Sequence, residues 1–384
     1  MNLTSVAAFM KKGVKYLILV AGVYYLVIFV IFPGTLAVIR AIFIPKEPLN
    51  PVYGQLDPLE FAEKATTNDS IPEYVLNTKN GKLPATLPDR IRVYKFKPQQ
   101  YSYLAGTNAI SEAEILGFTE EDLITDLKGD IYRWRNSKLG SMLNIEVSSR
   151  KVMLETSESG KSTYYTPGEI HQQNAKEFAI ELFKNIGRFN DELYQNGEQM
   201  VRLGSYTGNR LSETVDIREA HVALVDFYRN IDEVPILGTD PKEGLLRTIV
   251  KNPSRTPTPL NNPMVQASYW EIDPKTSAIY KIISVKDAWN AISQNRGVTT
   301  NITPKGMNPF SEYSPVYVQQ ILIDNIFLAY YETPKYQMYL QPIYVFEGTY
   351  TAIGSSGGQI SIYFPAITGE YTRKVNLPPD QFQE

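Results

Sequence analysis

The sequence contains no cysteine and only two histidines, His171 and His221. The lack of cysteine excludes thiol catalysis, disulfides, iron–sulfur ligation and every zinc site that uses cysteine. The two histidines are too far apart for the metalloprotease motif, in which two histidines lie four residues apart on one helix. These absences exclude many classes of catalytic and metal site before any motif is considered.

No charge of one sign dominates, because 38 Lys and Arg stand against 41 Asp and Glu, for a net charge of −3. This balance excludes a general nucleic-acid binder, which needs a strong basic field. With 43% apolar and 12% aromatic residues, the chain is not of the disordered class. Its 384 residues suffice for two or three domains with cores of their own.

The longest uncharged run extends from Tyr16 to Ile39. As a helix it would be about 36 Å long at 1.5 Å per residue, which exceeds the roughly 30 Å hydrocarbon core of a bilayer. It is too long for the apolar part of a cleaved signal peptide. Lys11, Lys12 and Lys15 precede it. The positive-inside rule therefore predicts a single-pass signal anchor in the cell membrane, with residues 1–15 in the cytoplasm and the body outside.

Beyond residue 46 the chain is acidic, because 33 basic and 41 acidic residues remain and 33 − 41 gives −8. Such a charge fits an extracytoplasmic body held away from anionic headgroups. Residues 40–58 are expected to form an extended, semi-rigid spacer, since they contain Pro45, Pro48, Pro51 and Pro58.

Two folded domains are expected, at residues 59–167 and 168–384, and each combines helices with short strands. The first contains a hairpin turn at Asn80-Gly81 and a helix at Ser111–Phe118, with Ser111 as its cap. The second begins with a helix over Glu169–Ile186, in which apolar residues recur at i, i+3, i+4 and i+7. Another helix is expected at Val285–Gln294, with Ser284 as its cap. The pattern predicts an α+β fold of tandem helix-on-antiparallel-sheet units.

Three segments together resemble PepSY-like domains of the YycH/YycI type of membrane-anchored bacterial regulators. They are Asp226–Ile236 (DFYRNIDEVPI), Tyr269–Ile272 (YWEI) and Tyr280–Trp289 (YKIISVKDAW). Leu340–Phe346 resembles the closing strand of such a unit, and the likeness covers roughly residues 90–365. The resemblance implies paired helix-plus-sheet units outside the membrane that bind other envelope proteins.

Two segments come close to catalytic motifs without completing them. Ser159-Gly160-Lys161-Ser162 ends like a phosphate-binding loop, but Glu155 stands where the first glycine is needed. Gly354–Gly358 matches G-x-S-x-G, but a strand follows it and both histidines precede it. We interpret the first segment as a hairpin turn and the second as a loop.

Paired carboxylates are the remaining candidates for chemistry: Glu120-Glu121-Asp122, Asp191-Glu192 and Asp232-Glu233. A glycosidase needs two of them about 5–10 Å apart across a cleft, which spacing in the sequence does not establish. We interpret them as solvated helix starts and turns, and both histidines as surface or packing residues. Trp134 and Trp289 are predicted to point into cores.

Three functions agree with these observations. The first is a non-catalytic, membrane-anchored extracytoplasmic protein that binds or regulates another envelope or membrane protein through protein–protein contacts. The alternatives are a structural component of envelope assembly or a surface scaffold, and an anchored carboxylate-dependent hydrolase. The first is the prediction made here, and it assigns no catalytic, cofactor-binding or metal-binding residue, no cofactor, no nucleotide and no nucleic acid.

Overall fold

In the computed structural model the residues described are 47–97, 103–124, 129–157, 167, 170–189, 192–208, 210–251, 262–268, 270–306, 313–352 and 355–374. They are 44% strand and 15% helix. The chain divides into two units, Met1–Pro48 and Leu49–Glu384. The second unit contains both of the sheets described below.

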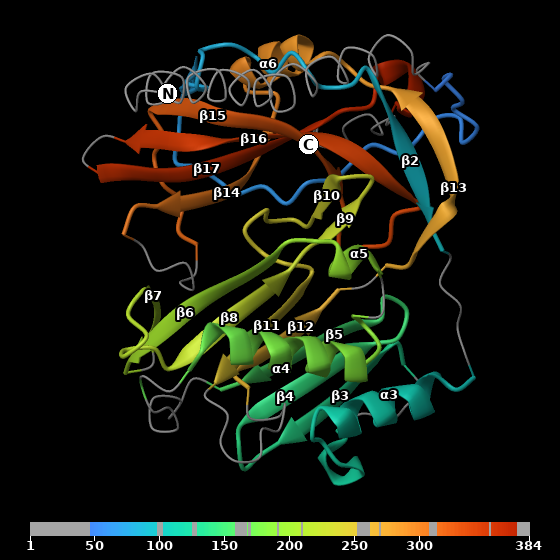
Figure 1. The fold of residues 1–384 in the computed structure, drawn as a ribbon, viewed down its shortest axis with the longest axis vertical. Helices are drawn as coiled ribbons and strands as arrows, with labels where there is room; N and C mark the ends of the chain where they lie inside the picture. The colour runs from blue at the N-terminus through green and yellow to red at the C-terminus, as the bar shows by residue number, and fades with distance from the viewer. Residues whose placement is uncertain are drawn as a thin grey trace, which may run out of the picture. The chain divides into compact units, whose positions relative to one another are not determined.

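One sheet has eight strands in the order β3-β4-β5-β12-β11-β8-β6-β7, and every neighbouring pair is antiparallel (Figure 1). Its outermost strand β3 alternates buried and exposed residues, as a strand with one face on a core must. The strands are β3 (Ile131–Asn136), β4 (Ser141–Glu146), β5 (Lys151–Thr156), β6 (Gln199–Thr207), β7 (Arg210–Thr214), β8 (Val222–Phe227), β11 (Leu246–Lys251) and β12 (Met264–Ala267).

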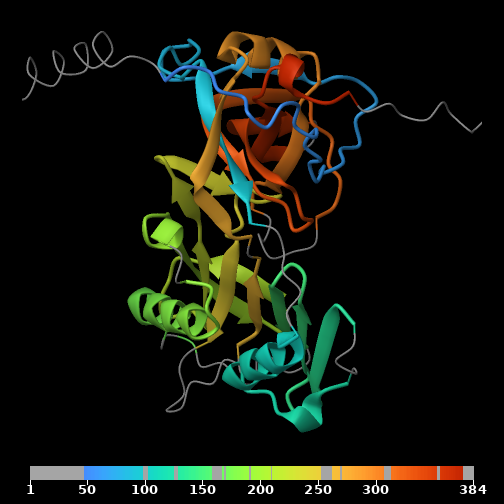
Figure 2. The same ribbon diagram turned by 90° about the vertical axis from the view of Figure 1, so that its right-hand side faces the viewer.

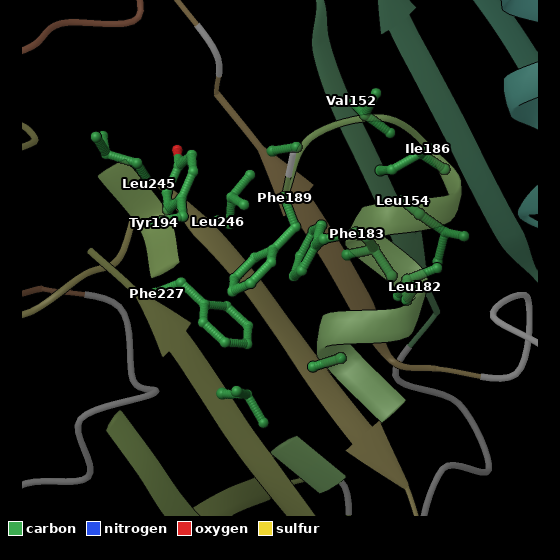
Figure 3. Close-up of a cluster of buried hydrophobic side chains, with 14 of the residues drawn as sticks. Val152, Leu154, Leu182, Phe183, Ile186, Phe189, Tyr194, Phe227, Leu245 and Leu246 are labelled. Carbon is green, nitrogen blue, oxygen red and sulfur yellow. The ribbon is translucent and has the colours of Figure 1, made fainter. Parts of the chain in front are cut away.

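Two helices, α3 (Ala105–Ile115) and α4 (Gln172–Asn185), contribute to the core on one face of this sheet (Figures 1 and 2). The apolar stripe of α4 faces the strands, and Figure 3 shows Phe183 directed toward Phe189 and Phe227. The rings of Phe183 and Phe227 meet edge to face with centroids 5.8 Å apart. The short helix α5 (Glu192–Gln195) adds Tyr194 to the same core.

The other sheet has nine strands. Its main path is β13-β2-β16-β15-β10-β9, while β1 pairs with β15, and β17 pairs with β16 and β14. Helix α6 (Val285–Ser293) packs on it through Ala288 and Ile292. The strands are β1 (Glu73–Leu76), β2 (Arg90–Phe96), β9 (Arg229–Ile231), β10 (Val234–Leu237), β13 (Ile272–Lys281), β14 (Val298–Pro304), β15 (Gln320–Tyr331), β16 (Tyr339–Ala352) and β17 (Ser355–Pro365).

The predicted α+β fold of tandem helix-on-sheet units is wrong. The described residues form mostly β-structure, with two sheets and four helices, and they do not show a PepSY-like unit. The reason is pairing between segments far apart in the sequence. β5 pairs with β12 across residue 167, where the domain boundary was expected, and β1 and β2 near the start pair with β15 and β13. Local periodicity carries no information about such pairing.

The prediction of a single-pass membrane protein is also corrected. Among the residues that the structure describes, no helix is long and apolar enough to cross a membrane. The longest of them, α4, has 14 residues. At 1.5 Å per residue it measures about 21 Å, well short of a bilayer core. The segment predicted to span, Tyr16–Ile39, lies outside the described residues.

Some local predictions are confirmed and others are wrong. Ser284 caps α6, because its hydroxyl accepts the Asp287 N–H at 3.1 Å, and Trp134 is buried. The Asn80-Gly81 segment closes no hairpin, since β1 pairs in parallel with β15. Ser111 does not cap a helix, because α3 already begins at Ala105. Trp289 is only partly buried and packs at the margin of the core.

Candidate functional site

One edge of β15 is only partly covered by neighbouring strands. β1 pairs with Gln320–Ile323 and β10 pairs with Tyr330 and Tyr331, both in parallel. β16 takes the opposite edge over the whole length of β15. Between β1 and β10, residues 324–329 of β15 therefore lack a strand partner on this edge within the described structure.

The direction of the backbone groups at this gap follows from two contacts. The N–H of Glu332 donates to the carbonyl of Leu237 at 2.9 Å, so Glu332 faces β10. In the antiparallel pairing with β16, Tyr330 lies opposite Pro342, which has no N–H to donate. Successive residues of a strand direct their backbone groups to alternate edges. Leu328 therefore directs its N–H and its C=O into the gap.

Pro235 explains why the gap is not closed by β10. The β10–β15 ladder ends at the pair Ile236–Tyr330, one residue after Pro235. The next donor of this parallel ladder would be the N–H of residue 235, and its acceptor would be the carbonyl of Leu328. Because proline has no N–H, the ladder stops there, and within the described part of the chain no strand pairs with the Leu328 carbonyl.

The gap forms the floor of a groove of about 440 Å³. This volume falls within the range of pockets that hold small ligands or side chains. Apolar side chains line most of it, while charged groups lie on the turn between β9 and β10 and on β2. The lining residues are Leu87, Pro88, Ile91, Arg92, Asp232, Glu233, Val234, Pro235, Phe327, Leu328 and Tyr330.

One wall of the groove is a strained turn. Asp232 and Glu233 connect β9 to β10 and have φ values of 52° and 64°. Two-residue hairpin turns of this kind favour asparagine or aspartate at the first position and glycine at the second. Asp232 is therefore accommodated, whereas the left-handed conformation costs Glu233 about 1 kcal/mol. Arg92 holds the turn by an ion pair with Asp232 at 3.0 Å, and the Tyr94 hydroxyl donates to the same carboxylate. Burial, followed by this hydrogen bond, raises the pKa of Tyr94.

Replacing Glu233 with glycine should raise the free energy of unfolding by about 1 kcal/mol, because glycine adopts a positive φ without steric cost. Urea denaturation measures the change. The matched control is Glu213→Gly in β7, where Glu213 is also exposed but has an extended backbone. In the control, the free energy of unfolding should fall by about 0.5–1 kcal/mol. Equal losses in both variants would contradict the strained turn.

A buried ion pair lies behind the groove. Arg229 at the start of β9 pairs with Glu332 just after β15, and both side chains are 0% exposed. The Trp270 backbone N–H donates to Glu332 Oε1 at 3.3 Å, and Arg229 Nη1 donates to the Trp270 carbonyl at 3.0 Å. Because the chain passes from β8 to β9 and from β12 to β13 here, this cluster joins the two sheets.

A half-buried carboxylate, Asp240, lies just after β10, outside the groove. Both oxygens of Asp240 accept from Asn301 Nδ2 at 3.0 Å, and the Lys242 N–H donates to one of them. Burial nevertheless raises the pKa of Asp240 above 3.8, its ordinary value. The folded state thus binds this proton more tightly than the unfolded state.

Asp240 should therefore make the protein less stable as the pH rises from about 3.8 through its raised pKa. Asp240→Asn should remove this decline and raise the free energy of unfolding at pH 7. Urea denaturation of both proteins at several pH values from 4 to 7 tests this. An unchanged pH dependence in the variant would contradict the assignment.

Only one of the acidic pairs predicted from the sequence, Asp232-Glu233, lies in the groove. Asp122 instead closes a capping box with Thr119 at the start of a short 3₁₀ helix, Glu120–Asp122. Asp191 lies outside the described residues, and Glu192 begins α5. Among the described residues, no group of histidine, cysteine and carboxylate side chains could hold a metal ion.

The two histidines do not lie together. His171 is exposed at the start of α4, and its side chain makes no capping hydrogen bond. The Nδ1 atom of His221 accepts the Tyr206 N–H at 3.2 Å, and burial lowers the pKa of His221. Of the two near-motifs, residues 159–162 and Gly354 lie outside the described residues, while Ser355 opens β17.

No sequence motif marks Arg92, Tyr94, Leu328 or Pro235 as residues of a site. One signal was available: a proline inside a short run of strand-forming residues (Val234–Leu237) is typical of a strand edge that has no pairing neighbour.

No family model and no curated protein matches the chain. One similar solved structure is the crystal structure of an uncharacterized protein from Eubacterium rectale ATCC 33656. The two chains share 10% identity over 80% of this chain and 92% of that one, with a TM-score of 0.43. This likeness is too low to support an argument about fold or function.

Proposed function

We propose that this protein is a non-catalytic binding protein that takes up an extended segment of a partner protein at the open edge of β15. One observation carries the proposal: on the edge of β15 opposite β16, the backbone of Leu328 faces an apolar groove and is paired with no strand among the described residues. An exposed sheet edge of this kind binds peptides by adding a strand, in which backbone hydrogen bonds supply affinity and alternate side chains enter pockets.

The segment would lie between β1 and β10 and continue their line along β15. Each added backbone hydrogen bond contributes about 0.5–1.5 kcal/mol net. Alternate side chains would lie on Ile91, Val234 and Phe327, where every buried methylene adds about 0.8 kcal/mol. The favourable free energy of these few contacts is offset in part by the entropy lost when a free segment becomes ordered. Binding should therefore be reversible, which suits a regulatory role. That the partner is another envelope protein, as the YycH/YycI-type resemblance implies, stays a prediction.

The test uses a fluorescent seven-residue peptide of alternating valine and threonine as the probe, with binding followed by fluorescence anisotropy. A series of such peptides carries a single N-methyl group, each at a different backbone nitrogen. In an added strand every second N–H faces β15, so affinity should fall about tenfold at alternate positions and stay nearly unchanged between them. Binding that ignores the position of the methyl group, or no binding at all, would overturn the proposal.

A further inference from the structure

We infer that the partner segment carries a lysine or arginine at the end that approaches β10, and that Glu233 binds it. This inference rests on the proposed function and specifies which segments the groove accepts.

The first reason is the charge balance at the rim of the groove. Three charged side chains lie there: Arg92, Asp232 and Glu233. Arg92 and Asp232 neutralise one another in their ion pair. Glu233 is exposed, and within the described part of the chain its carboxylate forms no ion pair. The rim therefore keeps one net negative charge where the segment would leave the groove.

The second reason is the conformation in which this charge is held. Glu233 has a φ of 64°, which glycine would adopt without strain. The turn thus keeps a carboxylate at position 233 at an energetic cost. Its position is fixed, because Arg92 and Tyr94 both contact the carboxylate of the adjacent Asp232. Strain kept at an exposed position beside a groove is typical of a binding site.

The third reason is the field of the whole body. Residues 47–384 contain 33 basic and 41 acidic residues, and 33 − 41 gives −8. A net negative body attracts cationic segments and repels acidic ones over distances of about a Debye length. The local and the long-range charge thus favour the same partner chemistry.

The position of the cation follows from the topology. The turn at Asp232 and Glu233 leads directly into β10, whose Ile236 is paired with Tyr330. A segment lying along residues 324–329 of β15 therefore has one end beside this turn and the other beside β1. The residue that contacts Glu233 belongs to the first end, and a cation at the opposite end is too distant to contribute a direct ion pair.

The experiment compares valine–threonine peptides that carry one terminal lysine or one terminal glutamate, placed at either end. With the wild-type protein at low salt, lysine at one end should bind about fivefold more tightly than glutamate there, as expected for a partly exposed ion pair. The difference should shrink in 0.5 M salt. Glu233→Gln should remove most of it, and Glu233→Lys should reverse it.

The matched control is Glu213→Gln, which changes the net charge equally at an exposed position in β7 and should leave the preference as in the wild type. Equal binding of lysine and glutamate peptides would overturn the inference. If lysine and glutamate peptides bound equally but affinity still alternated with the position of the N-methyl group, strand addition would stand and only the preference for a cation would be rejected. A lysine preference that Glu213→Gln reduces as much as Glu233→Gln does would also overturn the inference, since only the overall field would then act.

Discussion

Replacing Glu332 with alanine should lower the free energy of unfolding by about 3–5 kcal/mol, since it removes one partner of a buried ion pair. Glu332 and Arg229 are both 0% exposed. Without the carboxylate, the buried guanidinium of Arg229 loses its ion pair with Glu332, and the Trp270 N–H loses its acceptor. The loss should be large because these three residues join the two sheets where the chain passes between them.

Two controls separate this effect from ordinary truncation. Glu60→Ala removes the ion pair between Glu60 and Lys335, whose side chains are 80% and 78% exposed, respectively. It should lower the free energy of unfolding by less than about 1 kcal/mol. The double substitution Arg229→Met with Glu332→Leu should recover part of the loss, because no charge is then left buried, although the Trp270 N–H and carbonyl still lose their hydrogen bonds. Urea denaturation measures all of them. A cost below 1 kcal/mol for Glu332→Ala would contradict the structural role of the pair.

Pro235→Ala should weaken binding of the valine–threonine peptide by about tenfold. Alanine restores an N–H at the position from which the β10–β15 ladder would continue to the Leu328 carbonyl. The protein's own strand then occupies the acceptor that the partner segment needs, and the open edge becomes shorter. Fluorescence anisotropy with the same probe measures the change.

The matched control for this substitution is Pro58→Ala, because Pro58 is exposed and belongs to no strand. It should leave the affinity unchanged. If Pro235→Ala bound the peptide as tightly as the wild type while remaining folded, the Leu328 carbonyl would not be the acceptor, and strand addition at this edge would be contradicted.

The sequence predicted several elements that depend on neighbouring residues alone. The apolar stripe of α4, the Ser284 cap of α6 and the inward direction of Trp134 all follow from local spacing, and the structure confirms them. The proportion of helix to strand could not be predicted from local spacing. It depends on pairings such as Glu73 with Gln320, for which the sequence contains no local signal.

The groove was beyond sequence reasoning for the same reason. Its walls come from residues 87–92, 232–235 and 327–330, three segments that only the sheet topology brings together. Asp232 and Glu233 were recognised as an acidic pair, but their conformation and the contact with Arg92 depend on β2, which lies far away in the sequence. Pro235 was the single residue whose type pointed to an open strand edge.

Backbone amide hydrogen exchange at Leu328, followed residue by residue by NMR, tests the central claim most directly. In the free protein the Leu328 amide should exchange faster than those of Phe327 and Ala329, which face β16. With saturating valine–threonine peptide its exchange should slow at least tenfold, while the amides of Phe327 and Ala329 change little. A Leu328 amide already as protected as its neighbours, or one that the bound peptide leaves unprotected, would contradict the claim that this edge of β15 takes up a strand.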